Sequence, residues 1–164
     1  MLLEKELIES GVIRVAELMA IAAKTAPKAK GIDNIDIVVI SSKEELEKIA
    51  SKMEELAPTC GDFFKRDAAN VRNSIAVIAI GVRVIDYGIK TPPQYKIDAN
   101  LVLSLLNLGI AIGSAVKIAS LMNVDNRVMY SVGVAIQELK ILNSDFVIGI
   151  PLSATSKNIY FDRK

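Results

Sequence analysis

Apolar residues recur at every third or fourth position over several stretches of this chain, which is the period of an amphipathic helix. In the first stretch, residues 3–24, we expect the helix to be interrupted near Gly11. In the second, Ser42 and Glu45 form a capping box, because each side chain can pair with a free N–H at a helix start, and Pro58 should follow its end. Asp125 should cap the last helix. The helices predicted in this way cover residues 3–24, 43–56, 63–73 and about 126–140.

Short apolar runs rich in β-branched residues predict buried strands. The three runs cover residues 35–40, 75–82 and 146–150, and the last should end at Pro151. Between the second run and the next apolar segment, residues 83–98 carry Gly88, Pro92 and Pro93. These residues break regular structure, so we expect a loop or a lid there.

The segment Leu101–Met122 is nearly all aliphatic or small, and Lys117 is its only charge. Its length almost suffices to span a bilayer, so a membrane helix must be considered. Polar residues such as Asn107, and the ordinary elements on both sides, favour instead a helix buried all round in a soluble protein or dimer. Gly109 and Gly113, four positions apart, would let another backbone approach closely.

The composition adds a subunit interface to this picture. With 164 residues the chain predicts one domain, residues 1–164, built as an α+β or α/β three-layer fold with a small sheet and an extended tail. Hydrophobic residues make up 51% of the chain, and its mean hydropathy of +0.36 is high for a small soluble monomer. We therefore expect a homodimer that hides apolar surface. A partner could also receive Asn158–Phe161 as an added strand.

Charge and residue types exclude several functions. A net charge of +1 argues against nucleic-acid binding, and the acidic residues of the N-terminal sequence do not resemble a signal peptide. One cysteine, Cys60, is consistent with a reducing cytoplasm and cannot hold a zinc ion or an iron–sulfur cluster. There is no histidine, so no Ser-His or Cys-His pair is available. An enzyme of this composition would depend on a bound cofactor or on a few charged and tyrosine side chains.

Two polar segments and one arginine could bind an anionic ligand. Lys24–Gly31 carries three lysines at a helix end, which suit a phosphate or equally a solvated loop. Arg14 lies among apolar neighbours and would meet an anion or an acidic side chain. Gly149–Asn158 follows a strand with hydroxyls, a lysine and an asparagine, which suit phosphate or ribityl oxygens. The Gly109 and Gly113 spacing is no dinucleotide fingerprint.

Four phrases of this sequence resemble a family of uncharacterised proteins that contain a ferredoxin domain. They are RVAELMAIAAKTAPKAKGIDNI (14–35), FFKRDAANVRNS (63–74), LGIAIGSAVKIASLMNVDNRVMY (108–130) and GIPLSATSKNIYFDR (149–163). The resemblance implies a cysteine cluster between the second strand and the central helix, but residues 81–100 contain no cysteine here. We therefore expect no iron–sulfur cluster.

The order of elements is more distantly similar to the FMN-dependent nitroreductases. This resemblance implies an α/β/α fold with a long buried central helix at a dimer interface, a C-terminal tail exchanged between protomers, and FMN bound where the subunits meet. It assigns phosphate contacts to Arg14 and to Lys157 or Arg163, and places Lys28 where the family has a serine. The candidate residues for FMN binding are Arg14, Lys28, Gly149, Pro151, Ser153, Ser156, Lys157 and Asn158; Ser153, Ser156 and Asn158 are included because their polar groups suit ribityl or ring oxygens.

Two functions fit these observations. The first is a cytoplasmic, FMN-binding flavoprotein oxidoreductase, active as a homodimer on a small molecule whose identity the sequence does not give. The second is a non-catalytic dimeric module that has lost its redox centre and binds a partner or another small ligand. The missing cysteines and the altered loop after Pro27 motivate the second hypothesis.

Overall fold

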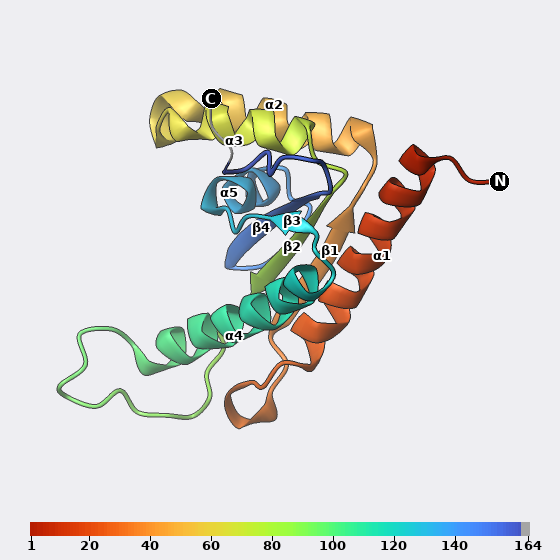
Figure 1. Cartoon of the computed structure of the whole chain (residues 1–164). Helices are drawn as coiled ribbons and strands as arrows, with labels where there is room; N and C mark the ends of the chain where they lie inside the picture. The colour runs from red at the N-terminus through yellow and green to blue at the C-terminus, as the bar shows by residue number, and fades with distance from the viewer. Residues whose placement is uncertain (162–164) are drawn as a thin grey trace.

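The computed structural model describes residues 1–161 and arranges them in three layers (Figure 1). A four-stranded sheet with the order β1-β2-β4-β3 lies in the middle, and its neighbouring strands are antiparallel. Helices α1 and α4 cover one face, and α2, α3 and α5 cover the other. The bounds are α1 Glu4–Thr25, β1 Ile35–Ile40, α2 Lys43–Cys60, α3 Phe63–Arg72, β2 Ala76–Val82, α4 Ala99–Leu121, β3 Asp125–Asn126, α5 Tyr130–Glu138 and β4 Phe146–Ser153.

The predicted strands and most predicted helices are confirmed. β1 coincides with the predicted run, and all seven residues of β2 are buried because helices cover both faces of the sheet. The Ser42 hydroxyl accepts a hydrogen bond from the Glu45 N–H at 3.2 Å, so the serine half of the predicted capping box starts α2. Residues 83–98 contain no helix or strand, as expected.

Four predicted boundaries were wrong. Helix α1 runs through Gly11 without interruption, and α2 continues through Pro58 to Cys60, although proline lacks the N–H that would donate to the carbonyl four residues earlier. β4 continues through Pro151, because within residues 1–161 its outer side is paired only at Gly149, Leu152 and Ser153, and the proline breaks no continuous ladder there. Asp125 starts the short strand β3 rather than a helix, and α5 begins at Tyr130.

Only one face of α4 is buried within the single chain. Its inner face carries Ala111, Ala115 and Ala119, which are fully buried against α1 and the sheet. These small side chains let the helices pack closely. The outer face keeps large aliphatic side chains exposed, so all-round burial of α4 would require a second molecule. Within the described part of the chain, α4 is the one helix long and apolar enough to cross a membrane, and 28% of its most apolar window is buried.

The tail that follows β4 lies against its own chain. Tyr160 is 2% exposed in the core between the sheet and α2, α3 and α5, and its hydroxyl lies 2.8 Å from the Ser74 hydroxyl. Exchange of the tail with a partner stays a prediction, but the strand predicted at Asn158–Phe161 is wrong, because residues 159–161 form a turn. Burial of Tyr160 in the chain's own core is the physical reason.

Candidate functional site

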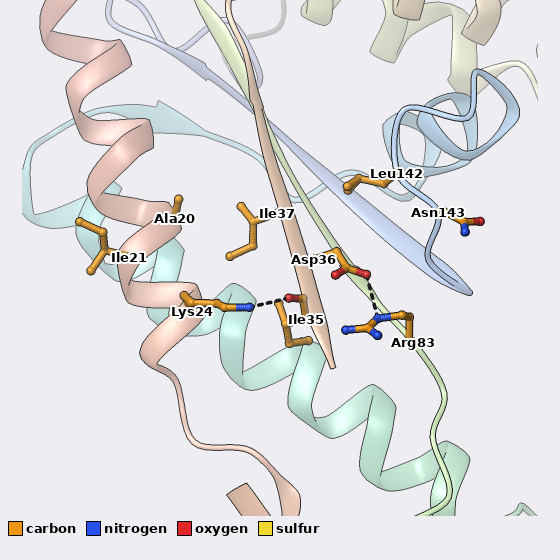
Figure 2. Close-up of a pocket in the computed structure, with 9 residues that line it drawn as sticks. All are labelled: Ala20, Ile21, Lys24, Ile35, Asp36, Ile37, Arg83, Leu142 and Asn143. Atoms are coloured by element: carbon orange, nitrogen blue, oxygen red, sulfur yellow. Dashed lines mark hydrogen bonds and ion pairs between the residues drawn. The ribbon is translucent and has the colours of Figure 1, made fainter. Parts of the chain in front are cut away.

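An open cleft of about 810 Å³ lies along β1, the edge strand of the sheet (Figure 2). One side is formed by α1 and the other by the segment before β4. The residues that line it are Ala20, Ile21, Lys24, Ile35, Asp36, Ile37, Arg83, Leu142 and Asn143. The floor of the cleft is therefore aliphatic, and two cations and one carboxylate lie at its rim.

Each cation at the rim already has an acidic partner. The Arg83 Nε donates to Asp36 Oδ2 at 3.1 Å, and the Lys24 ammonium forms an ion pair with Asp33 and donates to the Ile35 carbonyl at 3.2 Å. Partial burial is the largest single influence on the Asp33 carboxyl and acts to raise its pKa, but the hydrogen bonds from Lys24 and the Ile35 N–H, together with the charges of Lys24 and Lys28, lower the pKa overall. Both cations of the rim are therefore paired with carboxylates of the same chain, so the cleft does not resemble a dedicated phosphate site.

The three lysines of the predicted basic loop point to different carbonyl oxygens. The Lys28 ammonium donates to Lys24 O at 2.6 Å and Ala26 O at 2.9 Å, which satisfies carbonyls at the end of α1. The Lys30 ammonium donates to Tyr87 O at 2.9 Å. These side chains hold the loop together, so the structure favours the structural interpretation of this segment over an anion site.

Arg14 is also partnered within the chain. It lies in the first half of α1, where its Nη1 donates to Glu17 Oε2 at 2.9 Å. Eleven residues, about 16 Å of helix, separate it from the C-terminal end of α1 at Thr25, near Lys28. One protomer therefore does not bring Arg14 and Lys28 together.

The predicted residues of the C-terminal segment divide into a buried and an exposed group. A side chain at Gly149 would have its Cβ 2.2 Å from Val132 Cγ1, so this glycine allows α5 to pack on β4, and Pro151 is buried in the strand. Ser153 is fully buried, and within the described residues its hydroxyl makes no hydrogen bond of standard geometry. Ser156 and Lys157 are exposed.

Asn158, the last predicted residue with a described position, is half-buried next to β3. Its Nδ2 donates to Asp125 Oδ1 at 3.0 Å, and its Oδ1 accepts the Tyr160 N–H at 3.0 Å. These bonds fix the turn that leads into Tyr160. Arg163, the alternative phosphate contact, lies outside the described residues.

A buried polar cluster that the sequence analysis missed lies where α4 meets two loops. We call Asn34, Tyr87, Ser104 and Asn107 the amide hub; each is at most 2% exposed. Asn107 Nδ2 donates to Asn34 Oδ1 and to the Tyr87 hydroxyl, both at 2.9 Å. Asn34 Nδ2 and the Ser104 hydroxyl also reach the Tyr87 hydroxyl, at 3.1 and 3.4 Å. The only sequence signal was an asparagine inside an apolar helix.

The fold is that of the nitroreductases. A nitroreductase family protein from Clostridium novyi NT is similar over 88% of this chain and 74% of its own, with a TM-score of 0.64 and 16% identity. A nitroreductase with bound FMN from Desulfitobacterium hafniense DCB-2 is similar over 88% of this chain and 78% of its own, with a TM-score of 0.62 and 16% identity. NADPH:FMN oxidoreductase from Vibrio harveyi is similar over 88% of this chain and 60% of its own, with a TM-score of 0.62 and 16% identity.

Sequence similarity then defines the family. Residues 98–163 match the family described as "uncharacterized protein containing a ferredoxin domain" (DUF2148). An uncharacterised protein from Archaeoglobus fulgidus is 40% identical over 177 residues, which cover 98% of this chain and 96% of that protein. The chain belongs to this family of ferredoxin-domain-containing proteins.

Proposed function

We propose that this protein is an FMN-binding flavoprotein oxidoreductase that acts in the cytoplasm as a homodimer. The observation that carries the proposal is the similarity of 88% of the chain to a nitroreductase with bound FMN, at a TM-score of 0.62. FMN would supply hydride or one-electron transfer, and the protein would bind and orient it. We expect the substrate to be a small molecule.

The exposed face of α4 supports the homodimer. Its large apolar residues are Leu105, Leu106, Ile110, Leu121 and Met122, which are 39–63% exposed. Exposed apolar residues grouped on one helix often mark an interface, and the exposed Lys117 lies among them. Within the described chain, nothing lies within 4 Å of a Cβ added at Gly109 or Gly113, so both glycines leave room for a second backbone. We expect the second copy to pack on this face.

The residues of one protomer fit FMN in part. Lys157 and Ser156 are exposed beside the end of β4 and could contact phosphate or ribityl oxygens. The Ser153 hydroxyl lies just before them, but it is fully buried and interacts with the Tyr160 phenol. Arg14 is exposed and could exchange Glu17 for a phosphate. Lys28 does not fit this role, because its ammonium is bonded to carbonyl oxygens.

The test of FMN binding is native mass spectrometry together with a visible spectrum of gently purified protein. We expect two chains with bound flavin and a yellow preparation. Lys157→Ala should weaken FMN binding by about 1.5–3 kcal/mol, as for a charge-assisted hydrogen bond. The matched control is Lys65→Ala. Lys65 is also an exposed lysine, but it lies on α3, so its loss should leave the FMN affinity unchanged. A colourless protein that fails to quench added FMN fluorescence would contradict the proposal.

The test of the dimer is sedimentation velocity on Ile110→Glu. Ile110 is 44% exposed at the middle of the α4 face, so a buried carboxylate there should dissociate two packed copies while each protomer stays folded. Ile141→Glu changes another exposed isoleucine, beyond the end of α5, and should leave the dimer intact. A wild-type protein that sediments as a monomer at micromolar concentration contradicts the proposed assembly.

A second candidate function is a non-catalytic dimeric module that binds a partner or another small ligand. The observation that favours it is the internal pairing of the predicted phosphate cations, Arg14 with Glu17 and Lys28 with carbonyls. Native mass spectrometry together with the visible spectrum and FMN quenching separates the two functions. A stable dimer without chromophore and without FMN affinity supports the module, whereas bound flavin excludes it.

A further inference from the structure

The outer edge of β1 lies open along the cleft beside α1 (Figure 2). β1 comes first in the sheet order β1-β2-β4-β3, so among the described residues only β2 pairs with it. In an antiparallel pair, every second residue of a strand bonds to its neighbour. The Asn34 carbonyl accepts the Arg83 N–H at 3.0 Å, so the even-numbered residues of this strand face β2. The main-chain groups of Ile37 and Val39 therefore point outward, away from the sheet.

The protein itself closes one end of this edge. The outward N–H of Ile35 donates to Asp33 Oδ1 at 3.3 Å, and the Ile35 carbonyl accepts from Lys24 Nζ at 3.2 Å. Within residues 1–161, the outward main-chain groups of Ile37 and Val39 have no partner of this kind. Each of these two residues carries one N–H donor and one carbonyl acceptor, so both kinds of group are available to a further strand.

The open part of the edge lacks the features that usually protect an edge strand. Such features include a proline, a bulge or an unpaired charge. β1 contains no proline, and its register with β2 is continuous from Ile35 to Ile40. Its one charged side chain, Asp36, accepts from Arg83 Nε at 3.1 Å and from the Ser144 hydroxyl at 3.0 Å. A short, unprotected edge rich in β-branched residues favours the addition of a strand.

We propose that the β1 edge is a docking site for an extended peptide segment of another protein, which pairs with β1 as an added strand. The two walls of the cleft define the side chains of this segment. The lining on the α1 side is aliphatic and consists of Ala20, Ile37 and the 60% exposed Ile21, whereas Leu142 and Asn143 lie on the other side. Alternate side chains of a strand point to opposite faces, so the segment should carry aliphatic residues at every second position and polar residues between them.

The charges of the cleft favour an uncharged segment. Lys24 and Arg83 are each paired with a carboxylate of the same chain, so the rim offers no excess of either sign. The tail of the chain does not occupy this edge, because Asn158 donates to Asp125 on β3, at the opposite edge of the sheet. The proposal does not depend on the flavin, since it uses only the main chain of β1 and the lining of the cleft.

The test is fluorescence anisotropy with a labelled, uncharged peptide of alternating valine and threonine, as long as β1. We expect saturable binding, and no binding of the same peptide with methylated main-chain amides, which keeps the side chains but has no N–H donors. Ile37→Pro removes the outward N–H and leaves the bonds to β2, so it should weaken binding at least about fivefold. Ile21→Ser should weaken binding at least about threefold. The matched control is Leu18→Ser, at a 45% exposed aliphatic residue of α1 that does not line the cleft, and it should leave binding unchanged.

Each outcome bears on the proposal. A peptide that does not bind at millimolar concentration overturns it, and so does equal binding of the methylated peptide, because strand addition needs the main chain. If Ile37→Pro does not fold, the methylated peptide and Ile21→Ser decide. A second copy of the chain is the rival occupant: a dimer that Ile37→Pro dissociates and Ile110→Glu does not, in sedimentation velocity, would replace the foreign segment by a second copy. None of these measurements uses FMN, so failure of the proposed flavin function would leave them unaffected.

Discussion

The position of Tyr160 makes the attachment of the C-terminal tail testable by a single substitution, Tyr160→Phe. The change removes the phenol oxygen and keeps the ring, which is buried to 2% exposure. The lost contact is the 2.8 Å hydrogen bond to the Ser74 hydroxyl. Ser74 keeps its own 2.7 Å bond to Asn70 O, so no donor is stranded. At neutral pH the free energy of unfolding should therefore fall by only about 1 kcal/mol.

At high pH the sign of this difference should reverse. Burial raises the pKa of the Tyr160 phenol from 10.0 to about 12, although the Ser74 and Ser153 hydroxyls act to lower it. Between these values the unfolded chain loses the proton and the folded chain keeps it, so wild-type stability falls as the pH rises. The total fall is about 2–3 kcal/mol for a shift of this size. Tyr160→Phe lacks this ionisation, so its stability should exceed that of the wild type above about pH 11.

The assay is urea unfolding of both proteins at several pH values between about 8 and 11.5, a range set by the two pKa values. Tyr95→Phe, at a tyrosine that is 53% exposed, is the matched control for the loss of one phenol. Other groups titrate equally in all three proteins and cancel in the differences. If the difference between wild type and Tyr160→Phe stays constant with pH, the phenol is not buried against its own chain and the tail is attached elsewhere.

Two glycine substitutions give further expected outcomes. Gly133→Ala would place a Cβ 1.8 Å from the Val147 carbonyl oxygen, so α5 must move off β4 and we expect a loss of about 3 kcal/mol or more in urea unfolding. Gly11→Ala, in a helix where nothing lies within 4 Å of the new Cβ, should instead be neutral or stabilising by up to about 1 kcal/mol. Gly109→Ala meets the same open space within the chain, so it should raise helix stability yet weaken a dimer packed on α4, as sedimentation would show.

The strands could be predicted from the sequence because each is a short β-branched run between turn residues. β1 matches its prediction at both ends. The errors occurred where a long-range pairing overrides a local signal. Asp125 resembles a helix cap, but it pairs with Ser153, 28 positions later, and becomes part of a strand. Pro151 normally ends a strand, yet β4 continues because its outer neighbour is short.

The candidate site was harder to predict than the fold because its residues interact with distant groups. Lys28 and Arg14 are cations in the sequence, but only the structure shows that carbonyl oxygens and Glu17 already satisfy them. The residues of the amide hub form no local sequence motif. Asn107 bonds Asn34 across 73 positions and Tyr87 across 20, and no spacing rule connects these three residues. A polar residue inside an apolar helix indicates a buried partner without identifying it.

The distribution of side-chain size on α4 explains why the chain is so apolar. Its inner positions hold alanines, because α1 lies too close for larger side chains, and its bulky aliphatic residues therefore lie on the outer face. A helix that served only a monomer would need polar residues there. These exposed residues add to the apolar core in raising the mean hydropathy to +0.36. Because leucine and isoleucine exposed together favour association, the sequence and the fold both favour a second copy on α4.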